Sequence, residues 1–175
     1  MSADLTGTFA TLEDGRPAVR FSRVHGHPVD RVWQFVTDAG ELAHWFPSRA
    51  EIEPRPGGAI TFSGDPDLED STGRVIAVDP PRHLSFEWGG DELHFDLEAL
   101  DDRRTRFTLT NVLAAEDTAA RNAAGWEVCL AALDAWTRGE EPEAHAGADA
   151  AWKGFYDGYV RAGVPFGAPV PGLDA

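Results

Sequence analysis

Histidines and one cysteine are the side chains of this chain whose types and spacing could do chemistry. His25 and His27 lie two residues apart, so on a strand both imidazoles would point to one side and could bind a metal ion. Two imidazole ligands without a third protein ligand make a weak metal site. We therefore predict that the chain binds no metal ion and no other cofactor. The single cysteine, Cys129, excludes an intramolecular disulfide, and we expect it to be a packing residue of a helix rather than a nucleophile.

General acid–base catalysis would need a titratable side chain inside a cavity. His44, which precedes Trp45 and Phe46, is the best single candidate, but no partner for it can be named. A solvent-facing helix histidine is the alternative interpretation. His83 and His94 alternate with apolar residues, which places them on the wet face of a sheet. The sequence therefore leaves catalysis undecided and assigns no catalytic residue.

The elements that must position these residues are strands in which apolar and polar side chains alternate. Leu84, Phe86 and Trp88 share one face of one such segment. Turns rich in Gly, Pro and Asp separate the segments, which is typical of an antiparallel meander with one wet face. A longer polar loop covers residues 65–70. The predicted strands cover residues 6–12, 19–24, 49–53, 58–62, 73–78, 83–88, 92–100 and 104–112.

Helical spacing interrupts this pattern at three places. Two short helices follow the first strands. The first carries Val32 to Asp38, and we expect Asp30 to cap it and Gly40 to break it; the second covers 41–46. A long helix from about residue 116 to Gly139 carries an apolar stripe that should face the sheet, with Glu127 facing water. Gly125 inside this helix indicates a kink or a close approach to the sheet.

The composition changes after Gly139. We expect one domain over residues 1–139 and an extension over 140–175, with a polar linker, a short helix and a loose tail. Trp152, Phe155, Tyr156 and Tyr159 fall at helical spacing in the extension. This aromatic helix either docks on the domain, covers the mouth of a cavity, or contacts a second copy of the chain in a homodimer.

A curved antiparallel sheet that buries one face under a single long helix is an α+β architecture. Because this arrangement leaves a hollow between helix and sheet, we predict binding of a hydrophobic or aromatic small molecule there. Asn111 would be the polar anchor among apolar lining residues. The predicted ligand-binding residues are Phe62, Phe86, Trp88, Leu93, Phe95, Phe107, Leu109, Asn111, Trp126, Leu130 and Leu133.

The net charge of the chain limits the classes of partner that it can bind. The formal net charge is −15, which argues against nucleic acid and anionic membrane surfaces as partners. No apolar run has the length of a membrane span, and the first residues lack the basic and apolar regions of a secretory signal. We therefore expect a cytoplasmic protein.

A set of short motifs follows in order along the chain: Pro28–Trp33, Leu42–Phe46, Pro56–Gly58, Gly73–Val75, Val78–Arg82, Leu84–Trp88, Thr105–Thr110 and Gly125–Trp126. The set resembles the SRPBCC, or START-like (Bet v 1-like), superfamily. More narrowly it resembles bacterial homologues of the C-terminal domain of the heat-shock-ATPase activator.

This resemblance implies the helix-grip fold and leaves three functions open. The first is ligand binding, the second is polyketide cyclase- or aromatase-like or hydrolase-like catalysis in the same cavity, and the third is a co-chaperone-like interaction with protein. Family sequences often carry a His-Ser pair after the threonine of the last strand. Asn111 and Val112 occupy those positions here, which weakens an acid–base role.

Overall fold

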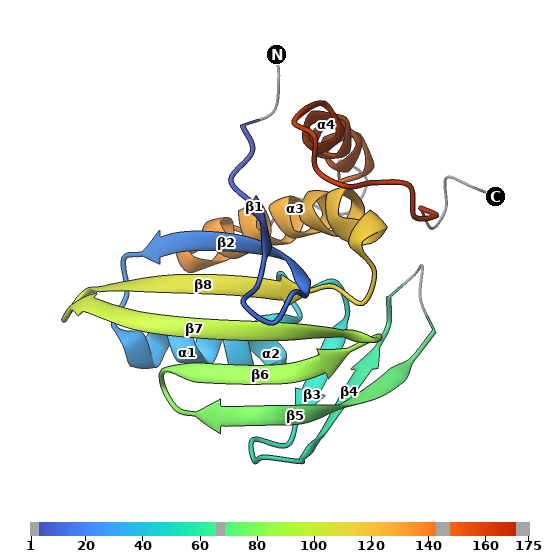
Figure 1. The fold of residues 1–175 in the computed structure, drawn as a ribbon. Coiled ribbons are helices and arrows are strands. Elements are labelled where there is room, and N and C mark those ends of the chain that lie inside the picture. The colour runs from blue at the N-terminus through green and yellow to red at the C-terminus, as the bar shows by residue number, and fades with distance from the viewer. Residues whose placement is uncertain (1–3, 66–68, 143–147, 171–175) are drawn as a thin grey trace.

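The main body of the molecule is one antiparallel sheet of eight strands (Figure 1). The computed structural model describes residues 4–65, 69–142 and 148–170. The strands are β1 (Thr8–Thr11), β2 (Pro17–His25), β3 (Arg49–Ile52), β4 (Ala59–Ser63), β5 (Ser71–Asp79), β6 (His83–Trp88), β7 (Asp91–Asp101) and β8 (Arg104–Val112). Their order across the sheet is β1-β2-β8-β7-β6-β5-β4-β3. The predicted antiparallel architecture is confirmed. The predicted polar loop, linker and tail lie partly outside the described residues.

The register of the central strands explains why one face of the sheet is buried. Phe86 pairs with Leu93 across β6 and β7, and Phe95 pairs with Leu109 across β7 and β8. Directly opposite residues in an antiparallel pair point to the same face, so these pairs build a continuous apolar surface. That surface faces the helices.

Two short helices, α1 (Val29–Thr37) and α2 (Ala39–Leu42), follow β2. Asp30 does not cap α1, which follows Pro28 without a side-chain cap. Asp38 instead caps α2, because its Oδ1 accepts hydrogen bonds from the backbone N–H groups of Gly40, at 2.9 Å, and Glu41, at 3.2 Å. Gly40 therefore lies inside the first turn of α2 and does not break a helix.

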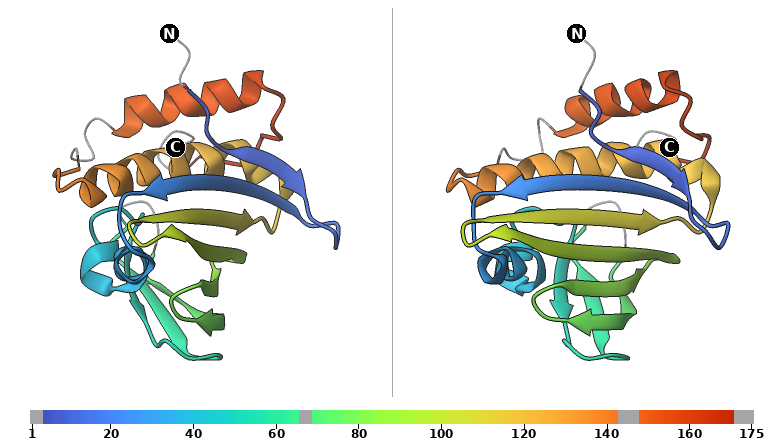
Figure 2. Two further views of the ribbon diagram at one scale, coloured as in Figure 1. Left: turned by 90° about the vertical axis from the view of Figure 1, so that its left-hand side faces the viewer. Right: turned by 60° about the vertical axis from the view of Figure 1, so that its left-hand side comes forward.

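The long helix α3 (Ala119–Thr137) follows a short 3-10 turn, η1 (Glu116–Thr118), and crosses the sheet. The last helix, α4 (Ala148–Arg161), lies against α3 on the side away from the sheet (Figure 2). Because α3 is enclosed between two layers, it has no fully water-facing side along its middle. Gly125 accordingly approaches α4 and not the sheet: a Cβ added there would lie 4.0 Å from Nε1 of Trp152.

Glu127 shows the consequence of this second layer most clearly. The prediction that it faces water is wrong, because its side chain is buried under α4 and the N-terminal segment, with 3% of the residue exposed. Its carboxylate accepts hydrogen bonds from the Thr6 backbone N–H at 2.6 Å, the Thr6 hydroxyl at 2.7 Å and the Tyr159 hydroxyl at 2.5 Å. These bonds compensate the removal of the charge from water.

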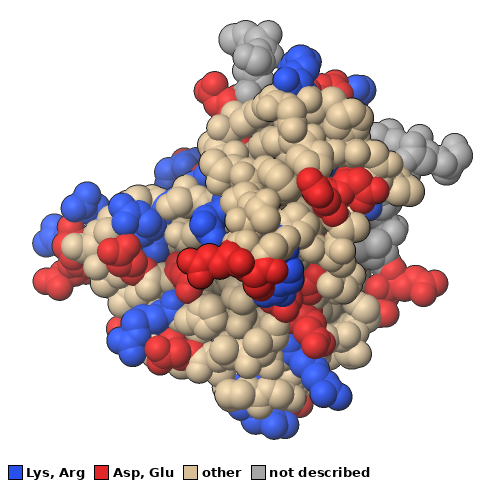
Figure 3. Space-filling model, in the orientation of Figure 1, with Lys and Arg blue, Asp and Glu red and all other residues tan. Residues whose placement is uncertain are grey.

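Acidic and basic side chains are intermixed on the face seen in Figure 3, which shows no continuous basic stripe there. Within the described part of the chain, none of the helices combines the length and apolar character that a membrane crossing requires.

Candidate functional site

The structure brings the predicted ligand-binding residues together on the concave face of the sheet, under α3. All of them are buried except Trp88, which is partly exposed. Their rings touch one another edge to face or tilted: ring centroids lie 5.4 Å apart for Phe86 and Phe95, 5.4 Å for Phe95 and Phe107, and 5.3 Å for Trp88 and Trp126. Such pairs stabilise a core beyond their buried area. That they contact a ligand stays a prediction.

Two aromatic rings from the chain after α2 fill the hollow that a single helix would leave. Trp45 and Phe46 are 3% and 6% exposed. The Trp45 indole donates a hydrogen bond to the Phe35 carbonyl at 2.9 Å. The Phe46 ring lies 5.8 Å from the Trp126 ring and 6.2 Å from the Phe62 ring, between centroids. These two side chains therefore pack the interior between sheet and helix.

Asn111, the predicted polar anchor, is occupied by protein partners. Its Oδ1 accepts hydrogen bonds from Trp126 Nε1 and Asn122 Nδ2, both at 3.1 Å. Its Nδ2 donates to Asp91 Oδ2 at 3.0 Å, and Asn122 Nδ2 donates to the same oxygen at 3.0 Å. Buried amides are normally satisfied in this way, and the network joins β8, α3 and the first residue of β7.

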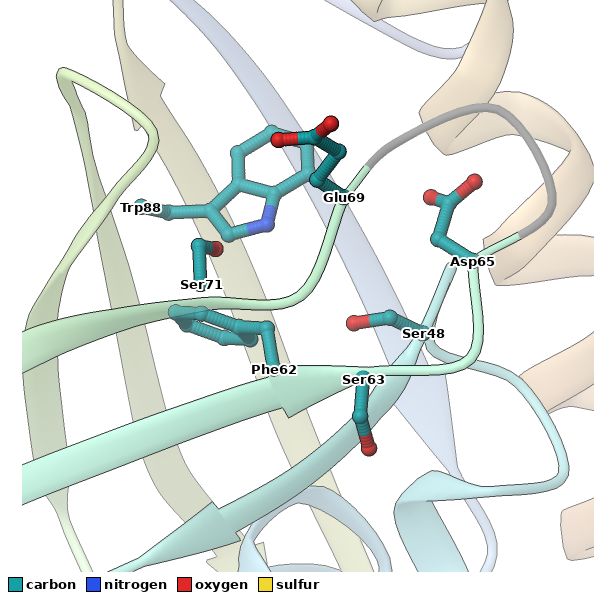
Figure 4. Close-up of a pocket in the computed structure, with 7 residues that line it drawn as sticks. All are labelled: Ser48, Phe62, Ser63, Asp65, Glu69, Ser71 and Trp88. Atoms are coloured by element: carbon teal, nitrogen blue, oxygen red, sulfur yellow. The ribbon is translucent and has the colours of Figure 1, made fainter.

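A small cavity opens where the apolar interior reaches the edge of the sheet, between β3, β4, β5 and β6 (Figure 4). Its volume is about 20 Å³, which is room for about one water molecule. Phe62 and Trp88 are the apolar part of its wall, and they are the only predicted ligand-binding residues that line it. The full lining is Ser48, Phe62, Ser63, Asp65, Glu69, Ser71 and Trp88.

Ser48 is the unusual member of this lining. It is 9% exposed, and its hydroxyl has no hydrogen-bond partner among the described residues. A buried hydroxyl without a partner is destabilising by about 1–3 kcal/mol, so it marks a place where a bound group could complete a hydrogen bond. In Figure 4 the Ser48 hydroxyl and the Trp88 indole nitrogen both face the space above Phe62.

The histidine singled out as a possible catalyst lies elsewhere. The His44 ring stacks on Trp136 of α3, with 3.6 Å between centroids and 11° between planes. Trp136 in turn donates a hydrogen bond to Glu41 at 2.6 Å. His44 is half-buried and lines neither hollow described here. Its position therefore supports packing between α2 and α3.

Ser85, His83 and Asp96 form a hydrogen-bonded series with the residue types of a catalytic triad. The His83 imidazole lies 2.7 Å from Asp96 Oδ1 and 3.1 Å from the Ser85 hydroxyl. A nucleophile must be reachable by a substrate carbonyl, and Ser85 is 1% exposed. The Ser85 hydroxyl is therefore out of reach of a substrate, although the Asp96 carboxylate at the other end of the series is exposed.

His25 and His27 line a second hollow, an open groove of about 590 Å³ between the end of β2 and the last turn of α3. The positive charges there are already paired: Arg23 Nε lies 3.2 Å from Asp134 Oδ2, and Arg138 Nη2 lies 3.2 Å from Glu140 Oε2. The described residues contain no group of three or more His, Cys, Asp or Glu side chains arranged to hold a metal ion.

His25 is 4% exposed, and burial lowers the pKa of its imidazole. Its Nδ1 lies 3.3 Å from the Thr137 hydroxyl, whose proton is donated to the Asp134 carbonyl at 2.9 Å. His25 must therefore donate from Nδ1 to Thr137. Its Nε2 lies in the interior without a partner in the described part of the chain.

Cys129 is a poor nucleophile. Burial raises the pKa of its thiol to about 12, and the Asp65 carboxylate adds to this increase. A thiol with so high a pKa carries almost no thiolate at neutral pH.

The model of the family described as activator of Hsp90 ATPase homolog 1-like protein matches residues 26–138. The chain belongs to this family. The family and the SRPBCC-type helix-grip fold inferred from the ordered motifs are thus confirmed.

Solved structures similar to this family member share its fold at low sequence identity. CalU16 from Micromonospora echinospora has a TM-score of 0.68 and 22% identity, over 92% of this chain and 96% of its own. EF2215 from Enterococcus faecalis, a conserved protein of unknown function, has a TM-score of 0.70 and 22% identity, over 89% of both chains. DynU16, a protein in the dynemicin biosynthetic locus, has a TM-score of 0.62 and 23% identity, over 73% of this chain and 49% of its own. No curated protein matches the chain.

The part of this activator-homologue family member that matches the family model contains the whole cavity lining. Sequence reasoning found Phe62 and Trp88 from their alternation in strands, but it missed Ser48, Asp65 and Glu69. The last two were visible only as members of a polar loop. Ser48 follows Trp45, Phe46 and Pro47 in sequence, and nothing in that pattern signals a buried hydroxyl without a partner.

Proposed function

We propose that this chain binds a small aromatic molecule at the cavity between Phe62, Trp88 and Ser48. The observation that carries the proposal is the buried Ser48 hydroxyl, which lacks a partner among the described residues and lines a cavity with two aromatic walls. Binding sites for small molecules are commonly apolar with a few placed polar groups. A ligand ring would lie against Trp88, and a polar substituent would reach Ser48.

Entry of a ligand requires a side chain to move, because a cavity of about 20 Å³ admits no more than about one water molecule. Trp88 is the wall residue suited to this movement. It is partly exposed, it ends β6, and Gly89 and Gly90 follow it with positive φ angles of 58° and 94°. The other predicted ligand-binding residues lie deeper in the interior, behind Trp88. They would form the surface that a ligand reaches when the indole moves.

The comparisons support a small-molecule role in a general way. The family and its structural relatives share the helix-grip architecture, and DynU16 is a protein of a biosynthetic locus. The cyclase-like or hydrolase-like alternative, the co-chaperone-like alternative and a homodimer stay predictions. Cytoplasmic location stays a prediction as well.

The test fills the cavity without disturbing the core. Ser48→Val adds about one methyl group to the cavity and removes the unpartnered hydroxyl, so the domain should remain folded. We expect indole and naphthalene to bind the wild-type chain saturably in titration calorimetry. For Ser48→Val they should lose at least about tenfold in affinity, because the two valine methyl groups would occupy space that a ring needs once Trp88 has moved. Ser22→Val, on the exposed side of β2, is the matched control. Equal affinity of Ser48→Val and wild type would place the binding site elsewhere.

A further inference from the structure

We infer that the ligand of this cavity is an aromatic molecule that carries a cationic nitrogen, such as an arylalkylamine. This inference rests on the proposed function and specifies the ligand class for the same site. It follows from the charges at the rim of the cavity, from the aromatic walls, and from the hydroxyl that lies between them.

The rim of the cavity is negative. Asp65 and Glu69 are its two ionisable lining residues, and both are carboxylic acids. Among the described residues that line it there is no Lys, Arg or His. Figure 4 shows the Glu69 carboxylate on the Trp88 side of the cavity and Asp65 on the side nearer the helix. An anionic ligand would be repelled at this rim, whereas an ammonium group would be attracted.

The walls favour a cation as well as an aromatic body. The face of a tryptophan ring attracts ammonium groups, and a carboxylate beside the ring adds to this attraction. Trp88 and Phe62 supply two rings at this site. A planar ligand that stacks on Trp88 would place a short aminoalkyl chain toward Glu69.

Ser48 supplies the third observation, which is independent of the acidic residues. It is nine-tenths buried, its hydroxyl has no partner in the described part of the chain, and the hydroxyl points into the cavity (Figure 4). A hydroxyl oxygen accepts a hydrogen bond from an N–H group. An ammonium group donates hydrogen bonds and cannot accept them. It can therefore donate to the Ser48 hydroxyl oxygen and to the Glu69 carboxylate at the same time.

The site chemistry is tested with three probes that share a phenethyl group and differ in the charge of its substituent: phenethylamine, propylbenzene and hydrocinnamate. Binding is followed by titration calorimetry and by the indole N–H resonance of Trp88. We expect the amine to bind at least about threefold more tightly than propylbenzene, and hydrocinnamate to bind most weakly. Added salt should reduce the difference between amine and hydrocarbon.

Two variants separate the local carboxylate from the overall negative charge. Glu69→Gln should weaken phenethylamine binding by about twofold to fivefold, the effect of one exposed ion pair, and leave propylbenzene unchanged. Glu98→Gln makes the same charge change in β7, outside the lining of the cavity, and should leave both affinities unchanged.

The outcomes distinguish this inference from the proposed function. If propylbenzene binds as tightly as the amine and Glu69→Gln has no effect, the cationic ligand class is wrong while the aromatic site stands. If the amine advantage is lost equally in both variants, it comes from net charge and the inference is wrong. If none of the three probes binds, the proposed function fails and this inference fails with it.

Discussion

The Tyr159 hydroxyl donates a 2.5 Å hydrogen bond to the Glu127 carboxylate and thereby joins α4 to α3. Burial and the neighbouring carboxylate raise the pKa of Tyr159 well above its usual range, so the hydroxyl keeps its proton. The same oxygen accepts a hydrogen bond from the Gly7 N–H at 2.9 Å. Glu127 is therefore the common partner of the N-terminal segment and the C-terminal helix, two segments that lie outside the matched residues 26–138.

Tyr159→Phe should destabilise the protein by about 1–3 kcal/mol, because it leaves a buried carboxylate with one hydrogen bond fewer. Urea unfolding followed by tryptophan fluorescence measures this change. Tyr156→Phe is the control, since the Tyr156 ring is only half-buried and stacks on Trp152. Equal stability of the two variants would contradict the role given to Glu127.

Gly7→Ala should destabilise the protein by more than 1 kcal/mol, on the order of an overpacked core site. A Cβ at Gly7 would lie 2.5 Å from the Phe21 ring and 2.6 Å from the Tyr159 hydroxyl oxygen. Gly26→Ala provides the comparison, because a Cβ at Gly26 would meet no atom within 4 Å and Gly26 does not have a positive φ. Faster proteolysis of α4 in Gly7→Ala than in Gly26→Ala would show that the close approach holds the helix in place.

Asn111→Leu should lower the free energy of unfolding by about 1–3 kcal/mol, because Trp126 Nε1 and Asp91 lose their partner. Trp126→Phe removes the indole N–H. In a double-mutant cycle we expect a coupling energy of about 0.5–1.5 kcal/mol between the two positions. Additive effects would mean that the 3.1 Å contact between them contributes no stability.

Stability should fall as the pH drops below about 6.5, the ordinary pKa of histidine. Burial lowers the pKa of His25 in the folded state, so the unfolded chain takes up this proton first. The unfolded state then binds more protons, and the free energy of unfolding decreases by at most about 1.4 kcal/mol for each pH unit in this window. The Asp134 carboxylate near Nδ1 opposes this shift, whereas Arg23 and His27 add to it.

His25→Gln keeps an N–H donor for Thr137 but does not titrate. Its unfolding free energy, measured in urea at pH 7 and at pH 5.5, should fall less over this interval than that of the wild type. The same fall in both proteins would assign the pH dependence to other groups.

The fold was largely predictable because its signals are local and repeated. Alternation in segments such as Leu84–Trp88 requires one buried face, and the short turns permit only neighbouring antiparallel strands. The errors were of a different kind. The helical pattern predicts that Glu127 faces water and that Gly125 marks a kink or a close approach to the sheet, because a helix period shows which residues share a side but not how many sides are covered. The residues that cover Glu127 lie outside its helix: Tyr159 is 32 positions away in sequence and Thr6 is 121 positions away.

The candidate site divides in the same way. Sequence by itself determined the helix-grip architecture, the family, and the aromatic residues that the concave face gathers, since each depends on composition and short-range order. Only the tertiary structure decided that Trp45 and Phe46 fill the interior, that Asn111 is already satisfied, and that Ser48 is buried without a described partner beside Trp88. These are properties of how volumes and hydrogen-bond partners from distant segments meet, and no local pattern encodes the space that remains between them.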